Sequence, residues 1–542
     1  MFDFSGLINA ILRRRSEDPV GNLKSATIWV QELPLSDMHR AQGEIVKALT
    51  SLNENRRMSL KERLRVVMYL DEKARSLQDK LCRDYLAVID VPQAPEKAYL
   101  GTILTFWEEM ANAYHICLRS FAQEPVQKLW PQIHLITLRG LYYYTQQAKW
   151  AYLRYLPVEA VVWRNLNRFY LFAEREGFEK TLFKPFPDAE LETSAMAQYL
   201  HAQLLHLASP DSLDPLQIDL VDRWLSHWAK SVTLEKDFRP HRQLYAVNLG
   251  DTKPARPLRR NMLGEKYRYF GVGLLLVAID KVLEQLRAGA VPARLGLTED
   301  CRLPQCLDLI DLVKNRWSRR NVERKHERVP KVKVVQVVQG FADIVAQLKP
   351  GARKRRRRAT GELIDYEVTG HTVGGTPLGA PTGEELFESR LAQWVMENES
   401  VSGCGVTADI HAEPLKIGTL VGLKPDSTRH FLIGVVRRIN RNPTARTYVG
   451  IETLSQTPIP VELHALGNGE GKQRVSDGLY LMELPEAQQP RSLLLARSEY
   501  EPGRLLMLKA QGKAYTIRLQ QPLALGEDYA RVTFDVLARH HA

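Results

Sequence analysis

Cysteine is scarce in this chain, which has only five in 542 residues. That number is too small for the disulfide framework of a small secreted domain. Cys301 and Cys306 lie close in sequence, but no second cysteine pair or histidine cluster completes a metal-binding set with them. We therefore expect all five to be reduced thiols in a cytoplasmic protein: Cys82, Cys117, Cys301, Cys306 and Cys404.

Long apolar runs are also missing. The longest, residues 270–279, is shorter than the roughly 20 residues that span a bilayer, so we expect no transmembrane segment. In residues 1–15 the charges follow the apolar part, which is the reverse of the order in a secretory signal. We interpret residues 1–35 as an N-terminal segment with an amphipathic helix, or alternatively a weak membrane or partner anchor.

Sequence signatures of catalysis are absent as well. Neither H-E-x-x-H nor G-x-S-x-G occurs. The glycine-rich stretch 467–472 has Leu466 and Gln473 where a phosphate-binding loop requires Gly and Ser or Thr, so we interpret it as a simple loop. Four histidines fall in helical stretches and are typical of packing or surface positions: His115, His134, His201 and His206. We expect neither an enzyme nor a resident cofactor.

The chain does have the composition of a globular protein, with 44% hydrophobic and 25% charged residues and enough length for several domains. Its net charge of +12 is concentrated in one segment. Residues 314–358 hold sixteen Lys or Arg against three Asp or Glu, a balance of +13, so the rest of the chain sums to about −1. A local field of this kind attracts anions, namely a dinucleotide, nucleic acid or an acidic protein surface.

Hydrophobic periodicity predicts helices over residues 38–317. Ser59 is a plausible N-cap for the first clear stretch, and breakers such as Pro, Gly, Asp and Ser separate the stretches. The helical stretches are 60–81, 99–121, 130–153, 157–177, 193–207, 216–234 and 266–288. The many aromatic residues at 142–155 are typical of core packing between helices.

Strand patterns replace helical spacing after Pro330 and continue to residue 537, with Gln511-Gly512-Lys513 as a predicted hairpin turn. The predicted fold class is therefore multidomain α+β, an all-α region followed by an antiparallel β-barrel and further C-terminal strands. We place the helical domain at 36–319 and the barrel at 320–458. A basic, Gly- and Pro-rich insertion interrupts the barrel at about 348–385. Residues 459–542 are expected to be a β-rich extension or a second barrel.

The most specific feature is a pair of polar motifs. Arg324 and Arg328 form R-x-x-x-R before the strand-like residues 331–340, and Asn398, Ser400 and Gly403 form N-x-S-x-x-G beside another strand pattern. Either motif alone is common, because arginines four apart recur in this basic stretch and polar turns often resemble the second. Together they supply guanidinium forks for phosphates and guanine edges, an amide that both donates and accepts, and a small polar turn.

This combination resembles the ligand site of a PilZ domain, the bacterial receptor module for cyclic di-GMP. Without the insertion, the two motifs have the separation usual in that family. Residues 431–438 and 448–452 resemble its later strands, although Thr453 and Leu454 stand where an aromatic is usual. The resemblance covers residues 320–458 apart from the insertion. It implies a barrel that binds cyclic di-GMP through Arg324, Arg328, Asn398, Ser400 and Gly403.

Three functions are compatible with these features. The first is a receptor in which the dinucleotide orders the linker around Arg324 and Arg328, and so reorients the helical region toward an unknown protein partner. The second is a nucleic-acid-binding protein that uses the basic residues 314–358, led by the run 353–358. The third is a scaffold that docks proteins without ligand, through a degenerate PilZ domain. We favour the receptor.

Overall fold

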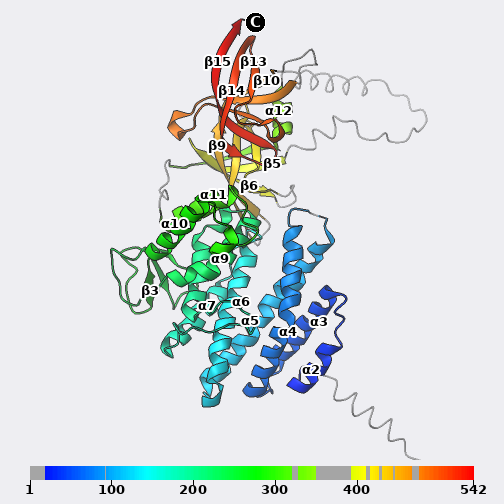
Figure 1. Cartoon of the computed structure of the whole chain (residues 1–542), viewed down its shortest axis with the longest axis vertical. Helices are drawn as coiled ribbons and strands as arrows, with labels where there is room; N and C mark the ends of the chain where they lie inside the picture. Colours follow the sequence, from blue (N-terminus) through cyan, green and yellow to red (C-terminus); the bar gives the residue numbers. More distant parts are fainter. Residues whose placement is uncertain are drawn as a thin grey trace, which may run out of the picture. The chain divides into compact units, whose positions relative to one another are not determined.

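The computed structural model describes residues 19–91, 93–319, 327–349, 392–409, 415–426, 430–442, 446–466 and 475–541. The chain forms two compact units, Met1–Val322 and Glu323–Ala542. The first unit is mainly helical and the second contains two closed β-barrels (Figure 1). The fold class predicted from the sequence, a helical region followed by antiparallel β-barrel structure, is confirmed.

The helices of the first unit begin where the sequence offers caps. Ser59 accepts a hydrogen bond from the backbone N–H of Glu62, which confirms it as an N-cap, and Asp37 and Asp214 cap their helices in the same way. The helices are α2 (Leu23–Gln31), α3 (Met38–Glu54), α4 (Leu60–Ala87), α5 (Tyr99–Gln123), α6 (Trp130–Tyr152), α7 (Ala160–Arg175), α8 (Ala195–Leu207), α9 (Pro215–Trp228), α10 (Gly273–Arg287) and α11 (Gln305–Trp317).

A small sheet interrupts the helical series and corrects the helix predicted over residues 266–288. The first part of that predicted helix is in fact strand β3 (Tyr267–Phe270), and helix α10 begins only at Gly273. Strand β3 pairs antiparallel with β1 (Tyr245–Asn248), and β1 pairs with β2 (Arg256–Pro257). A short apolar run suits a buried strand as well as a helical turn, so periodicity alone could not separate the two.

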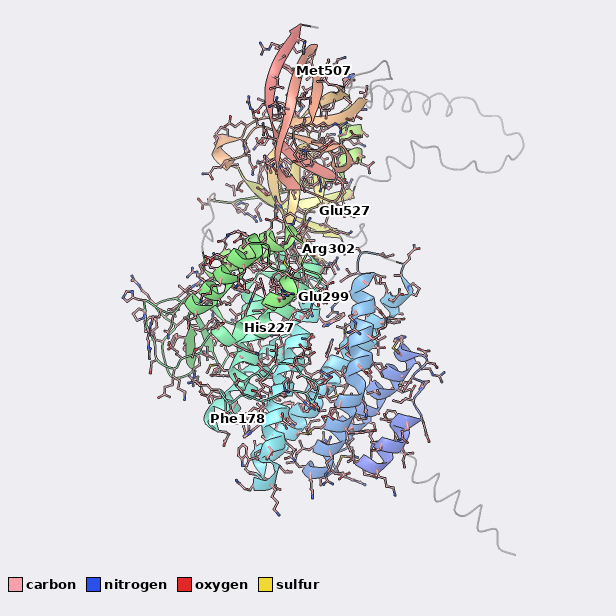
Figure 2. The ribbon with its side chains drawn as sticks, in the orientation of Figure 1. Phe178, His227, Glu299, Arg302, Met507 and Glu527 are labelled. Atoms are coloured by element: carbon pink, nitrogen blue, oxygen red, sulfur yellow. A yellow bond between two sulfur atoms is a disulfide. The ribbon has the colours of Figure 1, made fainter. Side chains whose placement is uncertain are left out.

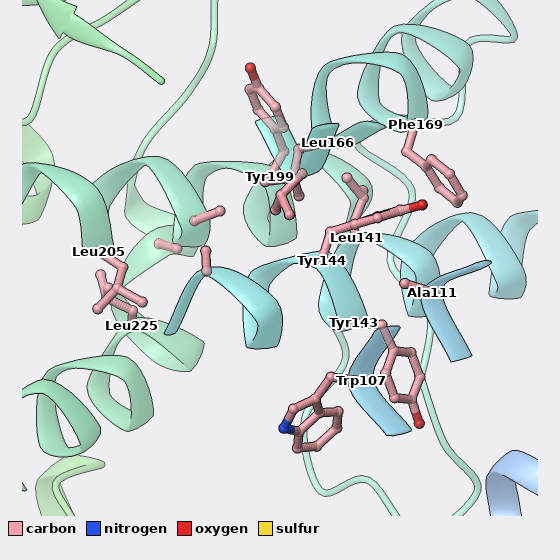
Figure 3. Packing of buried hydrophobic residues seen from close by; sticks show 14 of the residues in the cluster. Trp107, Ala111, Leu141, Tyr143, Tyr144, Leu166, Phe169, Tyr199, Leu205 and Leu225 are labelled. Atoms are coloured by element: carbon pink, nitrogen blue, oxygen red, sulfur yellow. The ribbon is translucent and has the colours of Figure 1, made fainter. Parts of the chain in front are cut away.

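Aromatic side chains fill the space between α5, α6 and α7. Trp107 and Tyr143 pack with ring centroids 5.7 Å apart, and Tyr144 meets Phe169 edge-on at 5.7 Å (Figure 3). Gly140 allows the close approach of α6 and α7, because a Cβ there would lie 2.1 Å from the ring of Phe169. The packing role predicted for the aromatic residues at 142–155 is confirmed.

One group of charged side chains inside the helical unit is paired. Nζ of Lys149 lies 2.7 Å from Oδ1 of Asp219 and 2.8 Å from Oδ2 of Asp222, and Asp222 also contacts Nε2 of His201 at 2.8 Å. Burial by itself would lower the pKa of Lys149, but the two carboxylates raise it above its ordinary value. Removal of one partner from such a buried pair costs roughly 3–5 kcal/mol, because the other charge is then left uncompensated.

Two of the five cysteines are not thiols. Cys301 and Cys306 form a disulfide with their Cα atoms 5.3 Å apart, which corrects the expectation that all five are reduced. The chain between them turns just before α11, and both side chains are buried against the helical core. The sequence showed the short separation but not this turn. Cys82, Cys117 and Cys404 are free.

The N-terminal part bears on two expectations. The amphipathic helix expected within residues 1–35 falls partly outside the described residues, which begin at residue 19 and include α2. No helix in the described part of the chain combines the length and the apolar character needed to cross a membrane.

The second unit begins with a closed barrel of six antiparallel strands in the order β4-β5-β6-β9-β8-β7. Inward-facing side chains such as Val335, Val337, Trp394 and Val406 are buried, as the alternation of a barrel strand requires. The strands are β4 (Val329–Gln339), β5 (Ala392–Ser400), β6 (Gly403–Asp409), β7 (Leu420–Pro425), β8 (Leu432–Arg441) and β9 (Arg446–Ser455), and helix α12 (Phe341–Leu348) follows β4.

A second closed barrel follows, in the order β10-β11-β12-β15-β14-β13. Gln511 and Gly512 have φ angles of 48° and 75° and connect the paired residues Ala510 and Lys513, so the predicted hairpin turn is confirmed. The strands are β10 (Ile459–Ala465), β11 (Val475–Leu481), β12 (Ser492–Ala496), β13 (Leu505–Ala510), β14 (Lys513–Leu525) and β15 (Tyr529–His541). Met507 in Figure 2 marks β13.

The two barrels pack against each other. Ile433 of the first barrel and Leu494 of the second belong to one buried cluster, which also contains Phe341 of α12. Glu527, which follows β14 and is labelled in Figure 2, lies 3.4 Å from Nζ of Lys416 in the first barrel. The second barrel therefore packs against one side of the first. Strands β5, β6, β8 and β9 of the first barrel carry the polar residues described next.

Candidate ligand-binding site

The two sequence motifs meet at the start of the first barrel. Arg328 immediately precedes β4, and Asn398 lies on the neighbouring strand β5, opposite Pro330. Nη1 of Arg328 donates a hydrogen bond of 3.1 Å to Oδ1 of Asn398, although 70 positions separate them. The contact is exposed, so both side chains lie at the surface of the barrel, where a ligand can reach them.

Ser400 and Gly403 close the turn between β5 and β6. They form the last register pair of the hairpin, and Oγ of Ser400 donates to the backbone carbonyl of Gly403 at 3.0 Å. Asn398 and Ser400 are two positions apart on one strand, so their side chains lie on the same face. A Cβ at Gly403 would lie 2.3 Å from the carbonyl oxygen of Ile451, so this glycine is required by the packing of β6 against β9.

A row of residues extends from Asn398 across the barrel. Asn398 pairs with Gly405 on β6, Gly405 pairs with Gly450 on β9, and Gly450 pairs with Arg438 on β8. The flanking Val406 and Val449 are buried, which places the row on the outer face. A Cβ at Gly405 would lie 2.9 Å from the amide atoms of Asn398, so that amide lies over the bare glycine.

The consequence is a flat strip with polar groups at both ends. The amide of Asn398 covers Gly405, and Gly450 beside it carries no side chain. The guanidinium-bearing residues Arg328 and Arg438 lie on either side of the two glycines. Sequence reasoning missed Gly405 and Arg438 as members of the site. A glycine inside a strand is a signal for close approach of another group, but the register that aligns these residues could not be read from the sequence.

Comparison with known protein families adds independent information. Residues 24–240 match the family model described as "Cyclic-di-GMP receptor FimW, N-terminal domain", and residues 461–537 match "FimW C-terminal beta-barrel domain". Together the two matches cover more than half of the chain. The chain belongs to the FimW family of cyclic di-GMP receptors. A search of curated proteins found no match.

The FimW matches fall on either side of the candidate site. The N-terminal match runs from α2 to the segment before β1, and the C-terminal match lies within the second barrel. The first barrel, with Arg328, Asn398, Ser400 and Gly403, lies between them and is covered by neither. The family therefore supports the ligand class predicted from the two motifs, and the site residues themselves remain a prediction.

The charge around the candidate site of this FimW-family chain favours an anion. Glu399 is the acidic neighbour of Asn398, and its carboxylate is engaged by Nζ of Lys331 at 3.1 Å and Nζ of Lys333 at 3.0 Å. Partial burial by itself would raise the pKa of Glu399, but the two lysines lower it below its ordinary value. Its negative charge is thus offset locally and does not oppose a phosphate near Arg328.

Some predicted elements lie outside the described residues. These are Arg324 of the R-x-x-x-R motif, residues 350–385 of the insertion with the basic run 353–358, and the glycine-rich stretch 467–472. Within the described residues, no group of three or more His, Cys, Asp or Glu is arranged to hold a metal ion. The neighbouring thiol of Cys404 is buried, and burial raises its pKa to about 12, so it stays protonated and unreactive at neutral pH.

Proposed function

We propose that this FimW-family chain binds cyclic di-GMP on the outer face of its first barrel, through Arg324, Arg328, Asn398, Ser400 and Gly403. The supporting observation is the hydrogen bond from Arg328 to Asn398, which joins the two motifs that the sequence keeps apart. The barrel is PilZ-like in this proposal, and the family match supplies the ligand class.

Each residue has a chemical role that its position allows. Arg328 can pair with a phosphate oxygen or fork onto the O6 and N7 edge of guanine, because its exposed guanidinium carries several N–H donors in a fixed planar geometry. Asn398 offers its amide Nδ2 to the ligand, while its Oδ1 holds the arginine in place. Ser400 and Gly403 act by shaping the turn, since the serine hydroxyl already donates to the glycine carbonyl.

We extend the site along the glycine strip. A planar guanine can lie against Gly450, which carries no side chain, next to the Asn398 amide that covers Gly405. Arg438 at the far end of the strip is exposed and can reach a phosphate or the face of a base. In this arrangement the ligand spans the strands β5, β6, β9 and β8.

Isothermal titration of the full chain with cyclic di-GMP tests the proposal. Wild-type protein is expected to release or absorb binding heat, and Arg328→Ala is expected to weaken binding by at least roughly tenfold. Arg539→Ala is a matched control, because Arg539 is also exposed but stacks on Tyr515 in the second barrel. Equal affinity of Arg328→Ala and wild type would show that the ligand binds elsewhere.

The signalling role follows from where the arginine pair lies in the chain. Arg324 and Arg328 are in the segment between α11 of the helical unit and β4 of the barrel. We infer that ligand binding changes how the helical unit is presented to a protein partner in the cytoplasm, where this second messenger acts. Small-angle scattering with and without cyclic di-GMP measures this change. Identical curves at saturating ligand would contradict the inferred change in the helical unit, but would not contradict ligand binding itself.

A further inference from the structure

The helical unit has a basic face that is separate from the ligand site. Arg164, Arg168 and Arg175 are exposed on α7, and Arg119 is exposed near the end of α5. Positions 164, 168 and 175 are four and seven residues apart, so the three arginines form one stripe along the helix. We call these four residues the α7 basic face.

In the part of the chain that the structure describes, the four arginines of this face are not engaged in ion pairs. Among the described residues, no carboxylate forms an ion pair with any of the four arginines. Glu174 is on the same helix, but it is committed to Arg268, whose Nε and Nη2 donate to it at 2.8 and 2.6 Å. Uncompensated arginines clustered on one surface repel each other, and an anionic partner relieves that repulsion.

His115 lies among the arginines of α5 and α7. It packs against Phe169 of α7 with ring centroids 6.2 Å apart. Partial burial lowers the pKa of His115, and the nearby guanidiniums of Arg119, Arg168 and Arg164 lower it further. The cluster is therefore joined across α5 and α7, and at neutral pH the histidine adds no positive charge to it.

An apolar pocket opens within the same stripe. It has a volume of about 340 Å³ and lies between the end of α5, the start of α6 and α7. Leu171, Phe172 and Trp130 line it, the last two with nearly parallel rings at 19°. Phe178, labelled in Figure 2, supports Phe172 from behind at a centroid distance of 6.0 Å. Arg168, Arg175 and Glu176 also line the pocket.

We propose that the α7 basic face and its pocket bind an acidic amphipathic helix of a partner protein. Along about 16 Å of α7 the face presents Arg164, then Arg168, then the pocket, then Arg175. A helix that carries carboxylates at four-residue spacing on either side of one apolar side chain is complementary to it. The apolar side chain enters the pocket beside Trp130, and the carboxylates pair with the arginines.

The pocket distinguishes this partner from other polyanions. A membrane surface or a nucleic-acid backbone would use the arginines alone, since neither presents a single apolar side chain to a recess of this size. Binding that depends on both the arginines and the apolar wall is therefore specific to a peptide with an anchor.

Fluorescence polarisation with the full chain tests the proposal. The probe is a fluorescein-labelled helical peptide of about 18 residues with Glu at four-residue spacing around one Leu. We expect saturable binding below about 1 mM that weakens by roughly tenfold or more in Arg164→Glu/Arg168→Glu and in Leu171→Ser. The charge-matched control is Arg259→Glu/Arg260→Glu, two exposed arginines in the loop before β3, which should bind as wild type does.

Two further probes decide the partner class. The same peptide with Gln for every Glu should bind at least roughly tenfold more weakly, and equal binding would overturn the proposal. A labelled DNA duplex is the second probe. If it binds more tightly than the acidic peptide, and loses affinity in Arg164→Glu/Arg168→Glu but not in Leu171→Ser, the partner is a nucleic acid and the proposal is overturned. Absence of peptide binding would overturn the proposal directly. Circular dichroism melting of each variant verifies that it is folded, and titration with cyclic di-GMP shows that its barrel is intact.

Discussion

Nη1 of Arg328 donates to Oδ1 of Asn398 across the first strand pair of the first barrel, and this single contact brings the two sequence motifs into one site. Strand pairing produces it, because Val329 and Pro330 lie opposite Glu399 and Asn398. The arginine that precedes β4 is thereby held over the end of β5.

The contact should appear as coupling in ligand binding. We expect Arg328→Ala and Asn398→Ala each to weaken cyclic di-GMP binding, and the double variant to lose less than the sum of the two, by about 1 kcal/mol. The reason is that Asn398 positions the guanidinium that contacts the ligand. Titration calorimetry on the four proteins measures the cycle, and strictly additive losses would mean that the residues act independently.

The glycine strip should tolerate little bulk when ligand binds. Gly450→Val places a side chain on the outer face, where the nearest group is Cβ of Arg438 at 3.1 Å. We expect cyclic di-GMP affinity to fall by roughly tenfold or more, because a guanine can no longer lie against the strand. Calorimetric titration compares it with wild type.

Gly512→Val is the control for that variant. Gly512 has a φ of 75° in the turn between β13 and β14, so a β-branched residue there should lower stability by about 1–2 kcal/mol and leave affinity unchanged. Unchanged affinity of Gly450→Val would exclude the strip from the binding surface.

Gly403 should matter for folding before it matters for the ligand. In Gly403→Ala the new Cβ would be 2.3 Å from the carbonyl oxygen of Ile451, so the backbone of β6 or β9 must move. We expect a loss of about 1–3 kcal/mol in the stability of the second unit. Gly101→Ala in helix α5 is expected to raise stability instead. Nothing lies within 4 Å of the added Cβ, and a helix favours Ala over Gly. Urea unfolding measures both, and a neutral Gly403→Ala would contradict the packing role.

The helical unit should lose stability on mild acidification. Burial lowers the pKa of His206 to about 4 from its ordinary 6.5, and its Nδ1 lies 2.9 Å from the hydroxyl of Tyr152. Between these two values the unfolded chain binds a proton that the folded chain does not bind. Stability therefore falls as the pH drops from about 6.5 through about 4, and it is independent of this group above 6.5. We expect a loss of about 2 kcal/mol from His206.

His206→Gln isolates this effect, because glutamine does not titrate. Unfolding midpoints at pH 7 and pH 4.5 should differ less in the variant than in wild type. A residual difference is expected, since burial also lowers the pKa of His115 and of His134. Parallel pH profiles for the variant and the wild type would show that His206 does not titrate in this range.

Local patterns predicted much of this chain correctly. The helices α4 to α9 and the hairpin turn at Gln511 and Gly512 follow from periodicity, caps and turn residues, all of which act over a few neighbouring positions. Strand β3 was assigned to a helix because its apolar run is short. After Pro330 the sequence predicted strand structure as one region, and the pairing and register of the individual strands were set only by the tertiary structure.

The candidate site shows the same division. Residue types and spacing in the two motifs predicted Arg328, Asn398, Ser400 and Gly403 as neighbours, and the structure brings them together at the β4, β5 and β6 ends. Gly405 and Arg438 joined them only through the register of four strands. Their sequence positions carry no trace of that alignment, because register depends on which faces of distant strands are buried.

By itself, the sequence determined that a helical region precedes β-structure, that positive charge gathers between them, and that two polar motifs resembling a PilZ ligand site are present. These are properties of composition and of short windows, where side-chain chemistry and backbone preference act locally. Only the tertiary structure decided the closure of two separate barrels, the disulfide between Cys301 and Cys306, and the row from Asn398 to Arg438. Each of those depends on contacts between residues that become neighbours only when burial of the hydrophobic cores selects one packing of the chain.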